Sequence, residues 1–138
     1  MSRAVADASY CGAWILEDES SAGAEDLLER VESGEMSLIA PSLWKYEMLN
    51  LLRSATRRKR LDEAGARAAQ CALSRVPFSQ VDVPDAVAQS EILKLAQAHN
   101  LSAYDAAYLE LAVRFRVPLY TADRALEKAA QNCGVEVV

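Results

Sequence analysis

The segment R-A-V-A-D, from Arg3 to Asp7, is a short apolar stretch that ends in an acidic residue. Such a run, followed by small polar residues, is typical of a buried β-strand. Three further segments have the same character: residues 37–40 (S-L-I-A), 78–83 (F-S-Q-V-D-V) and 118–121 (P-L-Y-T). The stretch G-V-E-V-V, residues 134–138, is a predicted final strand.

Between these strands the apolar residues follow helical spacing. Helices are predicted over residues 9–16, 20–33, 42–60, 62–76, 85–98, 102–115 and 123–132. Ser20, Asp62 and Ser102 are suitable N-caps for three of them. Short strands that alternate with helices predict an α/β protein, with a parallel sheet covered by helices on both faces.

The bulk composition is that of an ordinary globular domain. The chain has 138 residues, so residues 1–138 are expected to form a single domain. No apolar run approaches the ~20 residues of a membrane helix, and the first residues do not resemble a signal peptide. The three cysteines are far apart and form no disulfide framework, so a reducing cytoplasm is the expected compartment.

The composition also excludes several kinds of site. His99 is the single histidine, which rules out a multi-histidine zinc centre, and the cysteine spacing rules out a cysteine-rich one. The five glycines form neither a dinucleotide-binding motif nor a P-loop. The net charge of −5 counts against a protein that coats nucleic acid, but carboxylates that bind metal ions would contribute to that charge.

Two acids are placed at one edge of the predicted sheet by the strands that precede them. Asp7 closes the first strand and Asp123 follows the strand at 118–121, and functional crevices of α/β sheets lie beyond the carboxyl ends of the strands. Glu47 and Asp105 lie near helix starts, from which they could face the same edge. Clustered carboxylates suit Mg²⁺ or Mn²⁺ and repel one another without a cation.

Each of these acids also has a purely structural interpretation. Asp105 completes a capping box with Ser102, and Asp123 favours a helix N-terminus. Glu47 could be a solvated acid on an amphipathic helix, and Asp7 could simply end a strand. Placement alone leaves both interpretations open.

Four segments of the chain resemble the motifs of the PIN-domain family, and specifically its bacterial VapC-type toxins. They are V-A-D-A-S-Y-C-G-A-W-I-L (5–16), A-P-S-L-W-K-Y-E-M-L-N-L-L (40–52), L-S-A-Y-D-A-A-Y-L-E-L-A (101–112) and L-Y-T-A-D-R-A-L (119–126). Each motif alone is weak, but four in the same order over almost the whole chain are specific.

The resemblance implies a PIN-like three-layer α/β/α sandwich with a central parallel sheet of four or five short strands. It implies an endoribonuclease that depends on Mg²⁺ or Mn²⁺ and hydrolyses RNA phosphodiester bonds. It also implies a homodimer and a cognate VapB-like antitoxin. The catalytic and metal-binding acids would be Asp7, Glu47, Asp105 and Asp123, and the supporting polar residues would be Ser9, Asn50 and Thr121.

A basic run follows the second motif. Arg58 lies eleven residues after Glu47, so on one helix it would share a stripe with that acid at a distance of ~16 Å. Arg57 and Arg58 are therefore candidate RNA contacts, or simply cations that complement the helix dipole. The competing functional hypotheses are a catalytically silent PIN-like binding domain and a phospho-accepting receiver-like domain. The latter lacks paired acids after the first strand and a late lysine.

Overall fold

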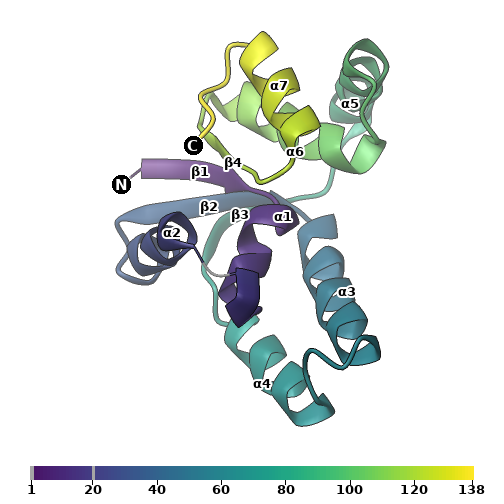
Figure 1. Ribbon diagram of the computed structural model, residues 1–138. Helices are drawn as coiled ribbons and strands as arrows, with labels where there is room; N and C mark the ends of the chain where they lie inside the picture. The colour runs from purple at the N-terminus through teal and green to yellow at the C-terminus, as the bar shows by residue number, and fades with distance from the viewer. Residues whose placement is uncertain (1, 20) are drawn as a thin grey trace.

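A parallel β-sheet forms the centre of the computed structural model, which describes residues 2–19 and 21–138 (Figure 1). Its strands are β1 (Ser2–Ala6), β2 (Met36–Pro41), β3 (Phe78–Asp82) and β4 (Leu119–Tyr120). They lie in the order β3-β2-β1-β4, and every neighbouring pair is parallel. The predicted α/β fold with a sheet of four or five parallel strands is confirmed.

Helices cover both faces of this sheet. Figure 1 shows α5, α6 and α7 on one side and α1 to α4 on the other. Their bounds are α1 Ala8–Cys11, α2 Ala22–Glu32, α3 Leu43–Arg57, α4 Glu63–Leu73, α5 Ala86–His99, α6 Ala103–Phe115 and α7 Arg124–Asn132, with 3₁₀ turns at Gly12–Trp14 and Glu17–Glu19. The three-layer arrangement follows from the central strands β1 and β2, whose runs of consecutive buried residues need cover on both faces.

The structure corrects four details of the sequence prediction. The helix expected over 9–16 ends at Cys11 and continues as a 3₁₀ turn over Gly12–Trp14, where a Cβ on residue 12 would lie 3.4 Å from Leu51 of α3. The helix expected over 42–60 ends at Arg57, and the helix expected over 62–76 ends at Leu73. The final strand is reduced to one parallel bridge between Leu119 and Val137, because β4 is only two residues long. Ser20 lies outside the described residues, and Ser21 caps α2.

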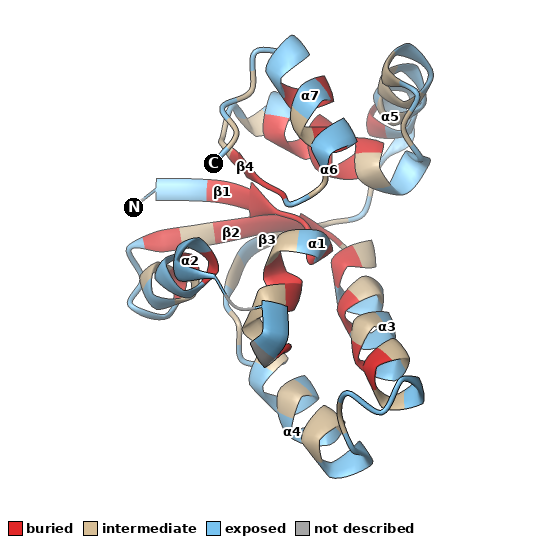
Figure 2. Cartoon of the chain, viewed as in Figure 1, coloured by how far each residue is buried: buried red, intermediate tan, exposed pale blue. Residues whose placement is uncertain are grey.

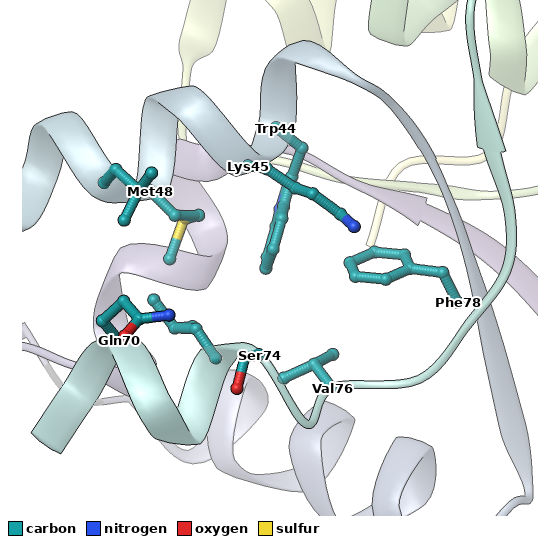
Figure 3. Close-up of a pocket in the computed structure, with 9 residues that line it drawn as sticks. Trp44, Lys45, Met48, Gln70, Ser74, Val76 and Phe78 are labelled. Carbon is teal, nitrogen blue, oxygen red and sulfur yellow. The ribbon is translucent and has the colours of Figure 1, made fainter.

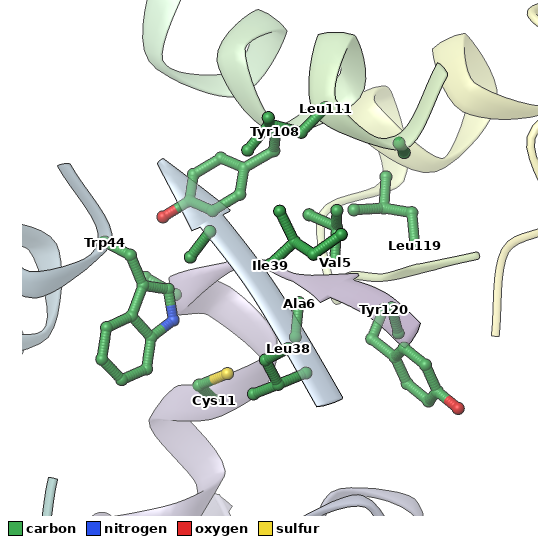
Figure 4. Close-up of a cluster of buried hydrophobic side chains, with 14 of the residues drawn as sticks. Val5, Ala6, Cys11, Leu38, Ile39, Trp44, Tyr108, Leu111, Leu119 and Tyr120 are labelled. Atoms are coloured by element: carbon green, nitrogen blue, oxygen red, sulfur yellow. The ribbon is translucent and has the colours of Figure 1, made fainter. Parts of the chain in front are cut away.

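Among the described helices, α6 has the most buried residues. Seven consecutive residues, Ala106 to Ala112, are buried, because α6 packs on β1, β2 and β4 and also contacts α5 and α7 (Figure 2). Figure 4 shows Tyr108 and Leu111 of this helix above the sheet residues Val5 and Ile39. Full burial of a side chain such as Leu109 stabilises the fold by about 1.5–3 kcal/mol.

One buried carboxylate of α6 belongs to a structural ion cluster. Glu110 is 5 % exposed and accepts two hydrogen bonds from Arg114, at 2.7 and 2.8 Å. Arg114 also donates two bonds to Asp82, at 3.0 and 3.2 Å. The cluster therefore connects α6 to the end of the edge strand β3. Without Arg114, the buried carboxylate of Glu110 would have no opposite charge beside it.

Candidate functional site

Asp7 is the most enclosed acid at the carboxyl edge of the sheet. It follows β1 directly, is 3 % exposed, and caps α1 by accepting a hydrogen bond from the N–H of Tyr10 at 3.0 Å. The Ser9 hydroxyl donates to Asp7 Oδ1 at 2.7 Å, and the Thr121 hydroxyl donates to Oδ2 at 2.5 Å. Both carboxylate oxygens are therefore oriented by hydroxyl groups from two different strand ends.

Thr121 connects Asp7 to the other acid that follows a strand. Its hydroxyl oxygen accepts a hydrogen bond from the N–H of Asp123 at 3.0 Å while its proton goes to Asp7. Asp123 caps α7 by accepting from the N–H of Leu126 at 2.9 Å. The local pattern of strand, hydroxyl and capping acid thus brings Asp7 and Asp123 to the same edge, and the helix N-terminus favours the negative charge of Asp123.

Asp105 lies in the first turn of α6, as the capping box predicts. The Ser102 hydroxyl accepts a hydrogen bond from the N–H of Asp105 at 3.1 Å. Asp105 itself is half-buried. Burial raises the pKa of its carboxyl, and the charges of Asp123 and Asp7 raise it further. The capping role and a role at the carboxyl edge are therefore compatible.

Glu47 and the residue that orients it come from helices on opposite sides of the sheet. Glu47 lies on α3, is half-buried, and its Oε1 accepts a hydrogen bond from the Tyr108 hydroxyl at 2.6 Å. Burial raises the pKa of Glu47, and the charges of Asp105 and Asp7 raise it further, while the bond from Tyr108 lowers it. Sequence reasoning missed Tyr108. The available signal was its spacing of three residues from Asp105, which puts both on one face of α6.

The four acids interact electrostatically. Burial is the largest cause of the raised pKa of Asp7; the Ser9, Thr121 and Tyr10 hydrogen bonds lower it, and the charge of Asp123 raises it. Each raised pKa at this edge therefore includes repulsion from another member of the quartet. Repulsion of this kind is relieved by protonation or by a cation.

The donor chemistry fits a hard divalent cation. The groups at the edge are carboxylates with neighbouring hydroxyls, which are ligands that Mg²⁺ and Mn²⁺ prefer. Within residues 2–19 and 21–138, however, no three acidic, histidine or cysteine side chains are grouped closely enough to hold an ion as they stand.

The other predicted polar residues occupy different places. Ser9 accepts a hydrogen bond from the N–H of Ala122 at 3.0 Å, so it belongs to the network around Asp7. Asn50 is exposed and lines a cavity of about 520 Å³ together with Ser9 and Glu47. Arg57 and Arg58 are exposed at the far end of α3, and Arg58 is its C-cap.

A second cavity lies on the opposite face of α3 and is not part of this site. It has a volume of about 230 Å³ and lies between α3 and α4 (Figure 3). Trp44, Met48 and Phe78 line it, and none of the four acids does. Trp44 is 2 % exposed and packs edge-on against Phe78, so it is a core residue.

Two further observations concern the described residues. None of their helices combines the length and the apolar character that crossing a membrane requires. All three cysteines are free thiols, as their spacing predicted.

Comparison with known proteins identifies the family. The sequence profile described as PIN domain matches residues 4–132. No significant match is found among curated proteins. Among solved structures, the chain is similar to PAE2754 from Pyrobaculum aerophilum, with 24% identity and a TM-score of 0.73 over 99% of this chain and 90% of that one. It is also similar to FitAcB from Neisseria gonorrhoeae, with 14% identity and a TM-score of 0.61 over 97% and 95%. At these identities the structural matches bear on the fold alone.

Proposed function

Because the chain belongs to the PIN-domain family, we propose that it is a metal-dependent endoribonuclease that hydrolyses RNA phosphodiester bonds. In this proposal residues 1–138 act as one domain. The site is the carboxyl edge of the sheet, where the metal-binding and catalytic acids are Asp7, Glu47, Asp105 and Asp123. The observation that carries the proposal is that the sheet edge brings these acids, from four separate segments, close enough to interact: the pKa values of Asp7, Glu47 and Asp105 are each raised in part by the charge of another of the four.

The residues of the chain have distinct tasks. Ser9 and Thr121 orient the two oxygens of Asp7, and Tyr108 orients one oxygen of Glu47, which leaves Oε2 for a ligand. A bound Mg²⁺ or Mn²⁺ would supply Lewis-acid polarisation of the scissile phosphate and activation of the attacking water. Asp7 is buried and the other three acids are half-buried, which strengthens their interaction with any cation that enters.

We further propose the biological setting that the family resemblance implies. The protein would be the toxin of a toxin–antitoxin pair, would act as a homodimer, and would bind a VapB-like antitoxin that blocks the acidic edge. A cytoplasmic location agrees with three free cysteines. Exposed Arg57 and Arg58 are proposed RNA contacts remote from the acids.

The direct test is cleavage of RNA with Mg²⁺ or Mn²⁺ by the wild type, Asp7→Asn and Asp62→Asn. Asp62 is the matched control, because it caps α4 through the same kind of bond, to the N–H of Gly65 at 2.6 Å. We expect Asp7→Asn to lose about a hundredfold or more in rate, and Asp62→Asn to keep wild-type activity.

The same assay separates the alternative of a silent PIN-like binding domain. Cleavage that persists at an equal rate in Asp7→Asn would come from a contaminant or from another site. A wild type that binds an antitoxin but shows no metal-dependent cleavage would make the silent domain the better description.

A further inference from the structure

Two aromatic side chains differ from all the others in the chain. The sequence contains two Trp, five Tyr and two Phe, all within the described residues. Seven of them are buried or half-buried, whereas Tyr46 is 75 % exposed and Tyr104 is 67 % exposed. A large exposed aromatic group is a common feature of binding surfaces, since its apolar area would otherwise favour burial.

Both tyrosines border the same cavity. Tyr46 directly precedes Glu47 on α3, and Tyr104 directly precedes Asp105 on α6. They line the cavity of about 520 Å³ that Ser9, Glu47 and Asn50 also line. On α3, Asn50 lies four residues after Tyr46 and three residues after Glu47, so its side chain neighbours both on the helix surface. The cavity is therefore continuous with the acidic edge.

The lining of this cavity selects an uncharged, flat ligand. Besides the two tyrosines it contains Ala8, Leu43 and Leu51, and none of the described residues that line it is an Arg or a Lys. A phosphate would find no cationic partner there and would meet the carboxylate of Glu47. A nucleobase suits the lining, because its π-face stacks on aromatic rings and an amide side chain such as that of Asn50 can bond its edge.

We propose that this cavity is a nucleobase subsite, in which Tyr46 and Tyr104 hold an unpaired base next to the phosphodiester at the acids. The proposal rests on the proposed nuclease function and assigns contact with an unpaired base to Tyr46 and Tyr104. A paired base is stacked within its own duplex and cannot enter the cavity. Asn50 is then a base-reading residue rather than a support for the metal.

The net charge of the chain gives this subsite a physical purpose. A protein of charge −5 gains little from attraction to the phosphate backbone, which provides most of the affinity of basic RNA-binding proteins. Stacking does not depend on charge and is insensitive to base identity. Stacking can therefore bind RNA next to the acids even though the charges of the RNA and the acids repel each other.

The test is binding of a short fluorescein-labelled single-stranded RNA of mixed sequence, measured by anisotropy in EDTA so that metal-dependent cleavage cannot occur. The variants are Tyr46→Ala, Tyr46→Phe, Tyr104→Ala and Tyr104→Phe. Each alanine variant should lose ~5- to 150-fold in affinity, the range for loss of one base stack. The phenylalanine variants keep the ring and should bind within about twofold of the wild type.

Leu93→Ala is the matched control. Leu93 is a large apolar residue on α5 that is 57 % exposed and does not line the cavity, so its removal should leave RNA affinity unchanged. A duplex of the same sequence should bind the wild type and both alanine variants equally. Thermal unfolding of the variants confirms that the fold is intact.

Several results would overturn the subsite. They are wild-type affinity in both alanine variants, equal losses in Leu93→Ala, and no binding of single-stranded RNA by the wild type. The oligomeric state, measured by sedimentation, provides another such result. Alanine variants that become monomeric while their RNA affinity is unchanged would show that the tyrosines belong to a protein interface. Cleavage with Mn²⁺ is scored separately, so a wild type that binds through the tyrosines without cleaving would contradict only the proposed function.

Discussion

Replacing Tyr108 by phenylalanine isolates the contribution of one hydroxyl to the proposed metal centre. The Tyr108 ring is 1 % exposed and packed in the core, and phenylalanine retains that packing. The substitution removes the 2.6 Å hydrogen bond to Glu47 Oε1. Hydrogen bonds to charged groups contribute about 1.5–3 kcal/mol, and loss of a group that orients a metal ligand lowers metal affinity by about 10–100-fold. The two ranges agree, since tenfold corresponds to about 1.4 kcal/mol.

The hydrogen bond from Tyr108 to Glu47 also predicts how the loss of metal affinity in Tyr108→Phe changes with pH. The hydroxyl lowers the pKa of Glu47 against the effect of burial, so its removal raises that pKa. Protons then compete better with the metal, and the deficit of Tyr108→Phe should grow as the pH is lowered. Titration with Mn²⁺, followed by calorimetry, measures the affinity at each pH without requiring cleavage.

Two comparisons make this prediction refutable. Tyr120→Phe removes the hydroxyl of another buried tyrosine, one that points away from Tyr108 in Figure 4, and should bind Mn²⁺ like the wild type. In a Glu47→Gln background, adding Tyr108→Phe should have little further effect, because the two residues act through one interaction. Wild-type Mn²⁺ affinity in Tyr108→Phe, with a clear loss in Glu47→Gln, would refute the reasoning.

Three further outcomes are expected. In EDTA at neutral pH, Asp105→Asn should unfold at a higher temperature than the wild type, and added Mn²⁺ should raise its melting temperature by less. The stability of the wild type should fall as the pH rises from the ordinary carboxyl pKa values of 3.8–4.5 through the raised pKa values of Asp7, Glu47 and Asp105, because the folded state binds the protons of these carboxyls more tightly than the unfolded state does. Thr121→Val should lower the free energy of unfolding by about 1–3 kcal/mol in urea, because it removes the hydroxyl that donates to Oδ2 of the buried Asp7 while the donors to Oδ1 remain. Arg114→Ala should lower the free energy of unfolding by ~2–4 kcal/mol, because it leaves the carboxylate of Glu110 buried and unpaired. The partial exposure of Arg114 keeps this value below that of a fully buried ion pair.

Controls for these outcomes exist in the same chain. Lys94→Ala removes an exposed ion pair with Glu91 and should change stability by less than about 0.5 kcal/mol, in contrast to Arg114→Ala. Thr56→Val removes a hydroxyl that bonds only within its own helix region and should be much milder than Thr121→Val. A melting temperature of the wild type in EDTA that falls steadily on acidification from neutral pH would contradict the sign derived for the acids.

Part of the candidate site is readable from local sequence. Asp7 and Asp123 each follow a strand and cap the next helix, and a strand end and a cap are both properties of a few adjacent residues. The carboxyl ends of parallel strands meet at one edge, so the topology then brings these two acids together. Glu47 and Asp105 required the family resemblance, because a helical acid has several faces to occupy.

The sequence by itself determined the alternation of strands and helices, the parallel sheet and the two acids at strand ends, because periodicity and capping are local. Only the tertiary structure decided that Tyr108 bonds Glu47 across 61 residues of chain, and that Tyr46 and Tyr104 line one cavity. It also decided that the last strand shrinks to a bridge at Val137. These features depend on how α3 and α6 pack against the sheet, and no short segment encodes the distance between two helices.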